Sequence, residues 1–124
     1  MSVTERPARI DHNKRYYEDC FEIARRNFAP FPRAKLVRGN VPDTLPAAGI
    51  DRVCYLSIDM NIAWPERKAI EYFWPKLSPG AFVVLDDYGF HGFEEQLHCM
   101  NEFARGVGVE ILALPTGQGL IAKP

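Results

Sequence analysis

Apolar residues recur at helical spacing in three parts of the chain. This pattern predicts amphipathic helices over residues 13–28, 65–74 and 93–104. Proline residues follow the first two stretches and glycines follow the third, which is typical of helix ends. Trp64 and Trp74 flank the second helix, and we expect both to belong to the core.

Continuous apolar runs between these helices predict strands. The runs at 52–59 and 81–87 are apolar on both faces, which is typical of parallel strands covered from both sides. A shorter strand is expected at 34–39. Two further strands, 109–114 and 119–124, flank a Pro-Thr-Gly-Gln turn and should form an antiparallel hairpin.

The order helix, strand, helix, strand, helix, strand, strand predicts an α/β fold. Alternating helices and strands build a mostly parallel sheet, and the hairpin adds an antiparallel strand at its end. We expect a turn at 77–80 and one turn of helix near residues 43–45. Residues 1–12 are expected to be a flexible segment, and residues 13–124 to form one domain.

Composition and charge argue against several classes of protein, among them nucleic-acid-binding and membrane-spanning proteins. With 47% apolar and 25% charged residues, the chain has the make-up of one globular domain. Its net charge of -1 gives no basic excess for binding nucleic acid. No apolar run approaches the roughly 20 residues of a membrane span. Three scattered cysteines and a polar N-terminus favour a cytoplasmic location.

Acidic residues stand where two predicted strands end. Asp59 ends the strand at 52–59, and Asp86 and Asp87 end the next one. Ligands of open α/β sheets bind at the carboxyl ends of the strands, and three carboxylates suit Mg²⁺. Such a metal could activate a substrate hydroxyl, with His91 as a general base. Alternatively, the paired aspartates only form a turn or cap a helix.

Several segments resemble the class I S-adenosylmethionine-dependent O-methyltransferases of the macrocin type. They are Ile58-Asp59-Met60, the segment WPKLSPGA at 74–81 and the segment LDDY at 85–88. The segment GNVPDTLP at 39–46 is similar to that family's adenine-contacting loop, and the resemblance covers about residues 14–124.

The resemblance implies roles for particular residues. Asp59, Asp86 and Asp87 match carboxylates that bind Mg²⁺, which positions the hydroxyl that receives the methyl group. Asn40 and Val41 would lie beside the adenine of S-adenosylmethionine, with Met60 also near this cofactor. The implied activity is Mg²⁺-assisted methylation of a small-molecule hydroxyl.

One departure from the family stands out. The family begins with a strand, a glycine-rich turn, a helix and a second strand ending in an acidic residue. This chain has no such segment before residue 39, so it resembles a truncated Rossmann-like domain without the first βαβ unit. The apolar edge left on the strand at 52–59 predicts a homodimer.

Two alternatives to the enzyme remain open. The chain could be a non-catalytic, dimeric methyltransferase-like remnant that does not bind the cofactor. A flavodoxin-like phosphoacceptor domain is a third possibility, but the C-terminal hairpin and the lack of an early acidic pair after a first strand disfavour it.

Overall fold

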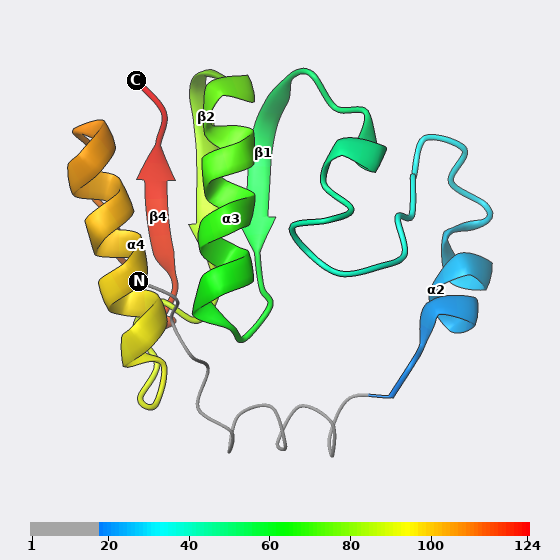
Figure 1. The fold of residues 1–124 in the computed structure, drawn as a ribbon, viewed down its shortest axis with the longest axis horizontal. Helices are drawn as coiled ribbons and strands as arrows, with labels where there is room; N and C mark the ends of the chain where they lie inside the picture. The colour runs from blue at the N-terminus through cyan, green and yellow to red at the C-terminus, as the bar shows by residue number, and fades with distance from the viewer. Residues whose placement is uncertain (1–17) are drawn as a thin grey trace.

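The structure, a computed structural model, describes residues 18–124 as a small mixed sheet with helices on one side (Figure 1). The helices are α2 (Phe21–Phe28), α3 (Ala63–Phe73) and α4 (Glu94–Val107). The strands are β1 (Val53–Ile58), β2 (Leu77–Leu85), β3 (Leu112–Ala113) and β4 (Gly119–Ala122). Short 3₁₀ turns are η1 (Pro46–Ala48) and η2 (Trp74–Lys76).

The four strands lie in the order β1-β2-β4-β3. β1 and β2 run parallel and are linked through α3, with Ile58 opposite Leu85. β4 is antiparallel to both β2 and β3, so the predicted C-terminal hairpin is confirmed. The α/β class predicted from the element order is also confirmed, with a sheet that contains one parallel pair.

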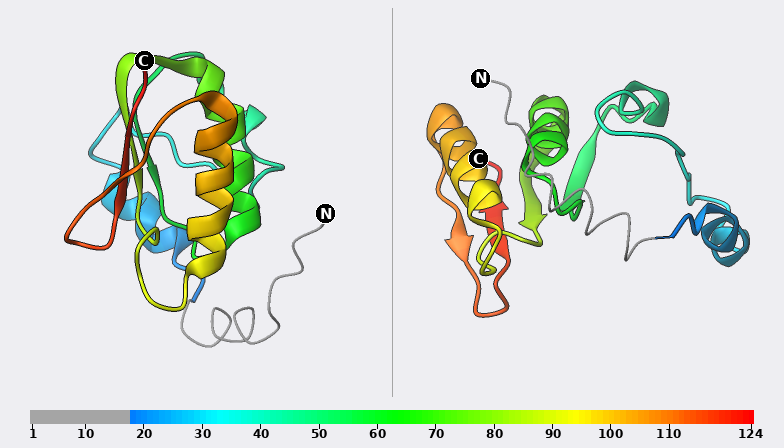
Figure 2. Two further views of the ribbon diagram at one scale, coloured as in Figure 1. Left: turned by 90° about the vertical axis from the view of Figure 1, so that its left-hand side faces the viewer. Right: turned by 60° about the horizontal axis from the view of Figure 1, so that its bottom comes forward.

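The core lies between the sheet and the pair α3 and α4. Val83 of β2 and Ile121 of β4 are register partners and fully buried. Ile70 of α3 and Met100 of α4 meet this face and are also fully buried. Both helices cover the same face of the sheet, as the two further views show (Figure 2).

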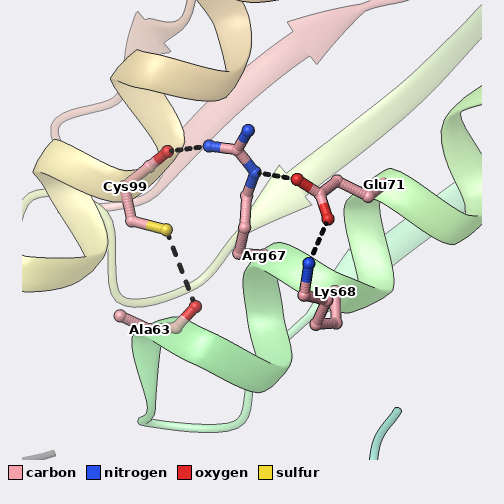
Figure 3. A network of polar contacts seen from close by, with 5 residues as sticks. All are labelled: Ala63, Arg67, Lys68, Glu71 and Cys99. Atoms are coloured by element: carbon pink, nitrogen blue, oxygen red, sulfur yellow. Dashed lines mark hydrogen bonds and ion pairs between the residues drawn. The ribbon is translucent and has the colours of Figure 1, made fainter. Parts of the chain in front are cut away.

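Partly buried polar contacts join α3 to α4 (Figure 3). Arg67 of α3 donates from Nε to Glu71 at 2.6 Å and from Nη1 to the carbonyl of Cys99 at 3.1 Å. The Lys68 ammonium donates to Glu71 at 2.8 Å, and this hydrogen bond is the main reason why the pKa of Glu71 is lowered. The guanidinium therefore links the two helices that close the core.

The expectation that helices cover both faces of the central strands is wrong. Tyr55, Phe82 and Leu112 lie on the face opposite α3 and α4, with exposed fractions of 59%, 48% and 61%. Val84 and Leu120, on the same face, are half-buried. We call this surface the open face. No helix among residues 18–124 packs on it, although its strands carry the apolar residues of a covered face.

The predicted strand at 34–39 is also wrong. These residues are exposed and form no strand, because no strand edge lies beside them to complete backbone hydrogen bonds. Lys35 instead donates to the carbonyls of Ala47 and Ala48, at 2.9 and 2.7 Å. The predicted turn at 77–80 is likewise replaced by the first residues of β2.

The helix predictions hold in part. α3 and α4 match the predicted helices to within a few residues, and Gly108 ends α4 with a φ of 72°. α2 is shorter than expected, since residues 18–20 precede it and residues 13–17 lie outside the described part. It buries no residue and stands apart from the sheet (Figure 1). No helix of residues 18–124 is both long and apolar enough to cross a membrane.

The buried side of the sheet should dominate stability. We expect Ile70→Ala to lower the free energy of unfolding by roughly 2–5 kcal/mol, because it leaves a cavity where Ile70 is 0% exposed. Leu112→Ala on the open face should cost less than about 0.5 kcal/mol. Urea denaturation measures both values, and equal losses would contradict the one-sided core.

Candidate functional site

The carboxyl ends of β1 and β2 lie side by side. Ile58 and Leu85 are register partners, and the backbone N–H of Asp86 donates to the carbonyl of Ile58 at 3.0 Å. Asp59 and Asp86 therefore follow directly from paired residues on neighbouring strands. The sequence-based expectation that these two strands are neighbours is confirmed.

The three carboxylates at this rim have different surroundings. Asp59 is exposed, whereas Asp87 is buried with an exposed fraction of 8%. Asp86 accepts a hydrogen bond of 2.6 Å from the side-chain amide of Gln118, in the turn between β3 and β4. Gln118 thus occupies an oxygen that the sequence assigned to a metal.

In this arrangement the rim does not fit Mg²⁺. Within residues 18–124, no group of three or more His, Cys, Asp and Glu side chains is arranged to hold a metal ion. A magnesium site needs several oxygens directed to one point. The assignment of Asp59, Asp86 and Asp87 to Mg²⁺ stays a prediction from the sequence.

His91 lies in the loop between β2 and α4. Its side chain is fully exposed, and its Nδ1 is 3.6 Å from a carboxylate oxygen of Glu94. Nothing in these contacts directs the imidazole toward Asp59 or Asp86. Its role as a general base stays a prediction.

A cavity of about 610 Å³ opens beside the carboxyl end of β1. One wall is the loop at 39–43, and the other is the segment from Met60 to the start of α3. Its lining residues are Gly39, Asn40, Val41, Pro42, Asp43, Met60, Ile62, Trp64 and Pro65. All three residues that the resemblance assigned to the cofactor are therefore gathered around one cavity.

Backbone hydrogen bonds close the loop wall on itself. Thr44 donates to the carbonyl of Asn40 through both its backbone N–H, at 3.0 Å, and its hydroxyl, at 2.9 Å. Gly39 has a φ of 137°, and a Cβ there would lie 2.4 Å from the Thr44 side chain. The buried Leu45 anchors the end of the loop in the core. The glycine is thus required by the turn that presents Asn40.

Sequence reasoning missed part of the second wall. Trp64 was expected in the core, but it is 40% exposed and lines the cavity, whereas Trp74 packs edge-to-face on Phe103. Ile62 and Pro65 were likewise not singled out. Trp64 follows Asp59 by five residues and lies on the first turn of α3, next to the carboxyl end of β1. This position was the signal in the sequence that could have placed it at the cavity.

Glu66 lies behind this second wall and is 2% exposed. Burial, and to a smaller extent the nearby carboxylates of Asp87 and Asp59, raise the pKa of Glu66 from 4.5 to about 8. Hydrogen bonds from the backbone of Ile62 and Met60 act in the opposite direction. Glu66 therefore carries a proton in most molecules at pH 7.

Comparison with known proteins identifies the family of the chain. The sequence pattern of the macrocin O-methyltransferase (TylF) family matches residues 12–110, which is most of the chain. The chain belongs to the macrocin O-methyltransferase family. The family resemblance predicted from the segments at 58–60, 74–81 and 85–88 is confirmed.

Two curated relatives illustrate what the chain is similar to. The chain is 28% identical over 100 residues to the 8-demethyl-8-(2,3-dimethoxy-alpha-L-rhamnosyl)-tetracenomycin-C 4'-O-methyltransferase of Streptomyces olivaceus, covering 77% of this chain and 38% of that one. It is 23% identical over 120 residues to the mycinamicin III 3''-O-methyltransferase of Micromonospora griseorubida, covering 89% and 47%. This chain spans less than half the length of either protein.

Two solved structures of O-methyltransferases share the fold. The O-methyltransferase NovP superimposes with a TM-score of 0.69 at 23% identity, over 82% of this chain and 44% of that one. CalS11, a TDP-rhamnose 3'-O-methyltransferase, gives a TM-score of 0.60 at 18% identity, over 70% and 40%. The partial Rossmann-like fold expected from the sequence is thus confirmed.

Glu66 gives this family member a distinct pH dependence of stability. Between pH 4.5 and about 8 the folded chain retains a proton on Glu66 that the unfolded chain has released. The free energy of unfolding should therefore fall as pH rises through this window, by up to about 1.4 kcal/mol per pH unit. Glu66→Gln removes this titration, so its stability should vary less with pH.

Urea denaturation of both proteins at intervals from pH 5 to 8 measures the two slopes. Asp87 and Asp59 face Glu66 from the strand ends, and Cys99 faces it from α4, where burial raises the pKa of the thiol. These groups remain in the variant, so only the Glu66 contribution is lost. Identical slopes would contradict the assignment of a raised pKa to Glu66.

Proposed function

We propose that this chain forms part of an S-adenosylmethionine-dependent O-methyltransferase site that methylates a hydroxyl group of a sugar or another small molecule. The observation that carries the proposal is the cavity that gathers Asn40, Val41 and Met60 beside the acidic rim. Membership of the family supports the reaction class. The names of two relatives, an O-methyltransferase of a rhamnosyl-tetracenomycin C and one of mycinamicin III, support the acceptor class.

The cavity lining suits the adenosine part of this cofactor. Val41, Met60 and Ile62 offer apolar surface to a flat ring, and the Asn40 amide can donate to and accept from its edge. The Asp43 carboxylate can accept hydrogen bonds from hydroxyl groups. A few polar groups among apolar ones are a common lining of small-molecule sites.

The rim next to this cavity supplies a proton acceptor. S-adenosylmethionine, when bound, supplies a methyl group on a positively charged sulfur. Asp59 directly precedes Met60 and is exposed at the end of β1. Its carboxylate would take the proton of the acceptor hydroxyl as the oxygen–methyl bond forms and the sulfur–methyl bond breaks. The products are a methyl ether and S-adenosylhomocysteine.

Cofactor binding can be followed with the tryptophan in the cavity. Titration with S-adenosylhomocysteine should change the intrinsic fluorescence, because Trp64 lines the cavity and Trp74 lies in the core contact with Phe103. Trp64→Phe should abolish the change, and Trp74→Phe should preserve it. Asn40→Ala should weaken binding about fivefold, the value of one net hydrogen bond near 1 kcal/mol.

Asn27→Ala on the exposed helix α2 is the matched control and should bind like the wild type. Calorimetry on the same proteins measures binding without fluorescence. It therefore shows whether a variant has lost binding or has only lost the fluorescent reporter. Absence of binding to the wild-type chain would contradict the proposal. It would favour the alternative of a methyltransferase-like protein that does not bind the cofactor.

We also propose that β1 pairs with β1 of a second copy of this chain. Within the described residues β1 pairs only with β2, so its outer edge presents free backbone groups. It contains no lysine, proline or glycine that would block a further strand. Arg52 directly precedes β1 and Asp59 directly follows it, so antiparallel pairing of two copies brings opposite charges together.

Sedimentation of the chain should therefore give a dimer. Tyr55→Lys places a charge on the β1 edge strand and should shift the equilibrium to monomers. Leu112→Lys, on the same open face but in β3 at the opposite edge, should leave the dimer intact. A monomeric wild type, or a dimer insensitive to Tyr55→Lys, would contradict this pairing.

A further inference from the structure

A buried carboxyl group lies directly behind the wall of the cavity. Glu66 points inward from the first turns of α3 and is only 2% exposed. Charged residue types are almost never buried to this extent unless a specific partner holds them. Its partners therefore indicate why an acidic residue stands at this position.

The partners of Glu66 are backbone groups of the cavity wall. Its Oε1 accepts a hydrogen bond from the N–H of Ile62 at 3.3 Å, and its carboxyl group also bonds the backbone of Met60. In return, the N–H of Glu66 donates to the carbonyl of Ile62 at 3.3 Å. One side chain thus holds two wall residues that are separated by Asn61.

The segment between these bonds has an unusual backbone conformation. Asn61 has a φ of 58°, in the left-handed region that few non-glycine residues adopt. Asparagine tolerates this conformation better than most residues, but single residues held there need support from their surroundings. Met60 and Ile62, on either side, both line the cavity. The shape of the wall therefore depends on how this turn is held.

We propose that Glu66 is a positioning residue that fixes the segment Met60–Ile62 as the cofactor-facing wall of the cavity. This inference rests on the proposed function, because it assigns the wall to S-adenosylmethionine. Glu66 acts through the backbone of Met60 and Ile62, and it does not itself line the cavity.

Part of this arrangement also caps helix α3. The N–H groups without intrahelical partners at a helix start are those of the N-cap and the first three helical residues, which are Ile62 and residues 63–65 in α3. The bond from the Ile62 N–H to Glu66 therefore resembles one half of a capping box. Met60 lies before the N-cap, so the contact of Glu66 with its backbone holds the loop and not the helix.

Three variants separate positioning from folding. Glu66→Gln keeps an oxygen acceptor of the same reach, Glu66→Met keeps the length without an acceptor, and Glu66→Asp keeps the carboxyl group with a shorter reach. Glu71→Met, on the outer side of the same helix, is the matched control. Replacing a buried polar group by an apolar one of similar shape can be neutral for folding, so Glu66→Met is expected to fold.

Two measurements are made on each full-length variant. Hydrogen exchange without ligand reports the protection of the Met60 and Ile62 amides, and calorimetry reports the affinity for S-adenosylhomocysteine. We expect Glu66→Gln to keep both within about threefold of the wild type, because its amide oxygen still accepts the N–H of Ile62. Glu66→Met and Glu66→Asp should lose at least about tenfold in amide protection and in affinity, a factor that corresponds to about 1.4 kcal/mol.

The two readouts make failures distinguishable. The positioning role is wrong if Glu66→Met and Glu66→Asp retain the protection of both amides. It is also wrong if these two variants bind S-adenosylhomocysteine as tightly as the wild type and the control Glu71→Met do. If the wild type does not bind S-adenosylhomocysteine but the variants lose amide protection, the proposed function fails and the structural action of Glu66 on the wall stands. If Glu66→Met does not fold, the comparison of Glu66→Asp with Glu66→Gln tests the positioning role through the same two measurements, amide protection and affinity.

Discussion

The parallel pairing of β1 and β2 is the constraint on which the site depends. Because α3 connects these two strands, their carboxyl ends meet at one rim, where Ile58 and Leu85 are partners. The residues that leave β1 there form the wall of the cavity before they enter α3. The same pairing sets Asp59 next to Asp86, while the turn of the hairpin reaches across to Asp86 through Gln118. Cavity and acidic rim are therefore two parts of one edge.

The second organising feature is that the helices cover one face only. α3 and α4 bury one side of the sheet, and Arg67 ties them together, while Tyr55 and Phe82 remain exposed on the open face. The chain spans less than half of the relatives and solved structures that it resembles. A doubly wound domain carries helices on both faces. The uncovered face and the free edge of β1 are thus where this chain can accept further polypeptide, and we assign the edge to a second copy.

The sequence predicted those parts of the structure that short-range patterns determine. Amphipathic spacing located α3 and α4, and the Pro-Thr-Gly-Gln turn located the hairpin. The segment at 34–39 has the composition of a strand, but a strand needs a neighbouring edge, and its residues find none here. The apolar residues Tyr55 and Phe82 led to the wrong expectation of helices on both faces for the same reason. Composition shows that a residue suits a buried strand, but it does not show that a packing partner is present.

The candidate site was predictable only to the level of family segments. Asn40, Val41 and Met60 came from the resemblance, and the structure places all three around one cavity. Trp64 and Glu66 were missed because apolar periodicity identifies the helix but not the surroundings of each residue. It does not show that Trp64 lines the cavity or that Glu66 is buried behind the cavity wall. The bond from Gln118 to Asp86 joins residues far apart in the chain, so no local pattern could predict it.

The central claim is that the cavity between the loop at 39–43 and the start of α3 binds the cofactor. Amide chemical shifts of the ¹⁵N-labelled chain, followed by NMR as S-adenosylhomocysteine is added, test this claim most directly. The account predicts saturable shifts concentrated at residues 39–43 and 60–65. Shifts centred on the open face around Phe82, or no shifts at saturating ligand, would contradict it.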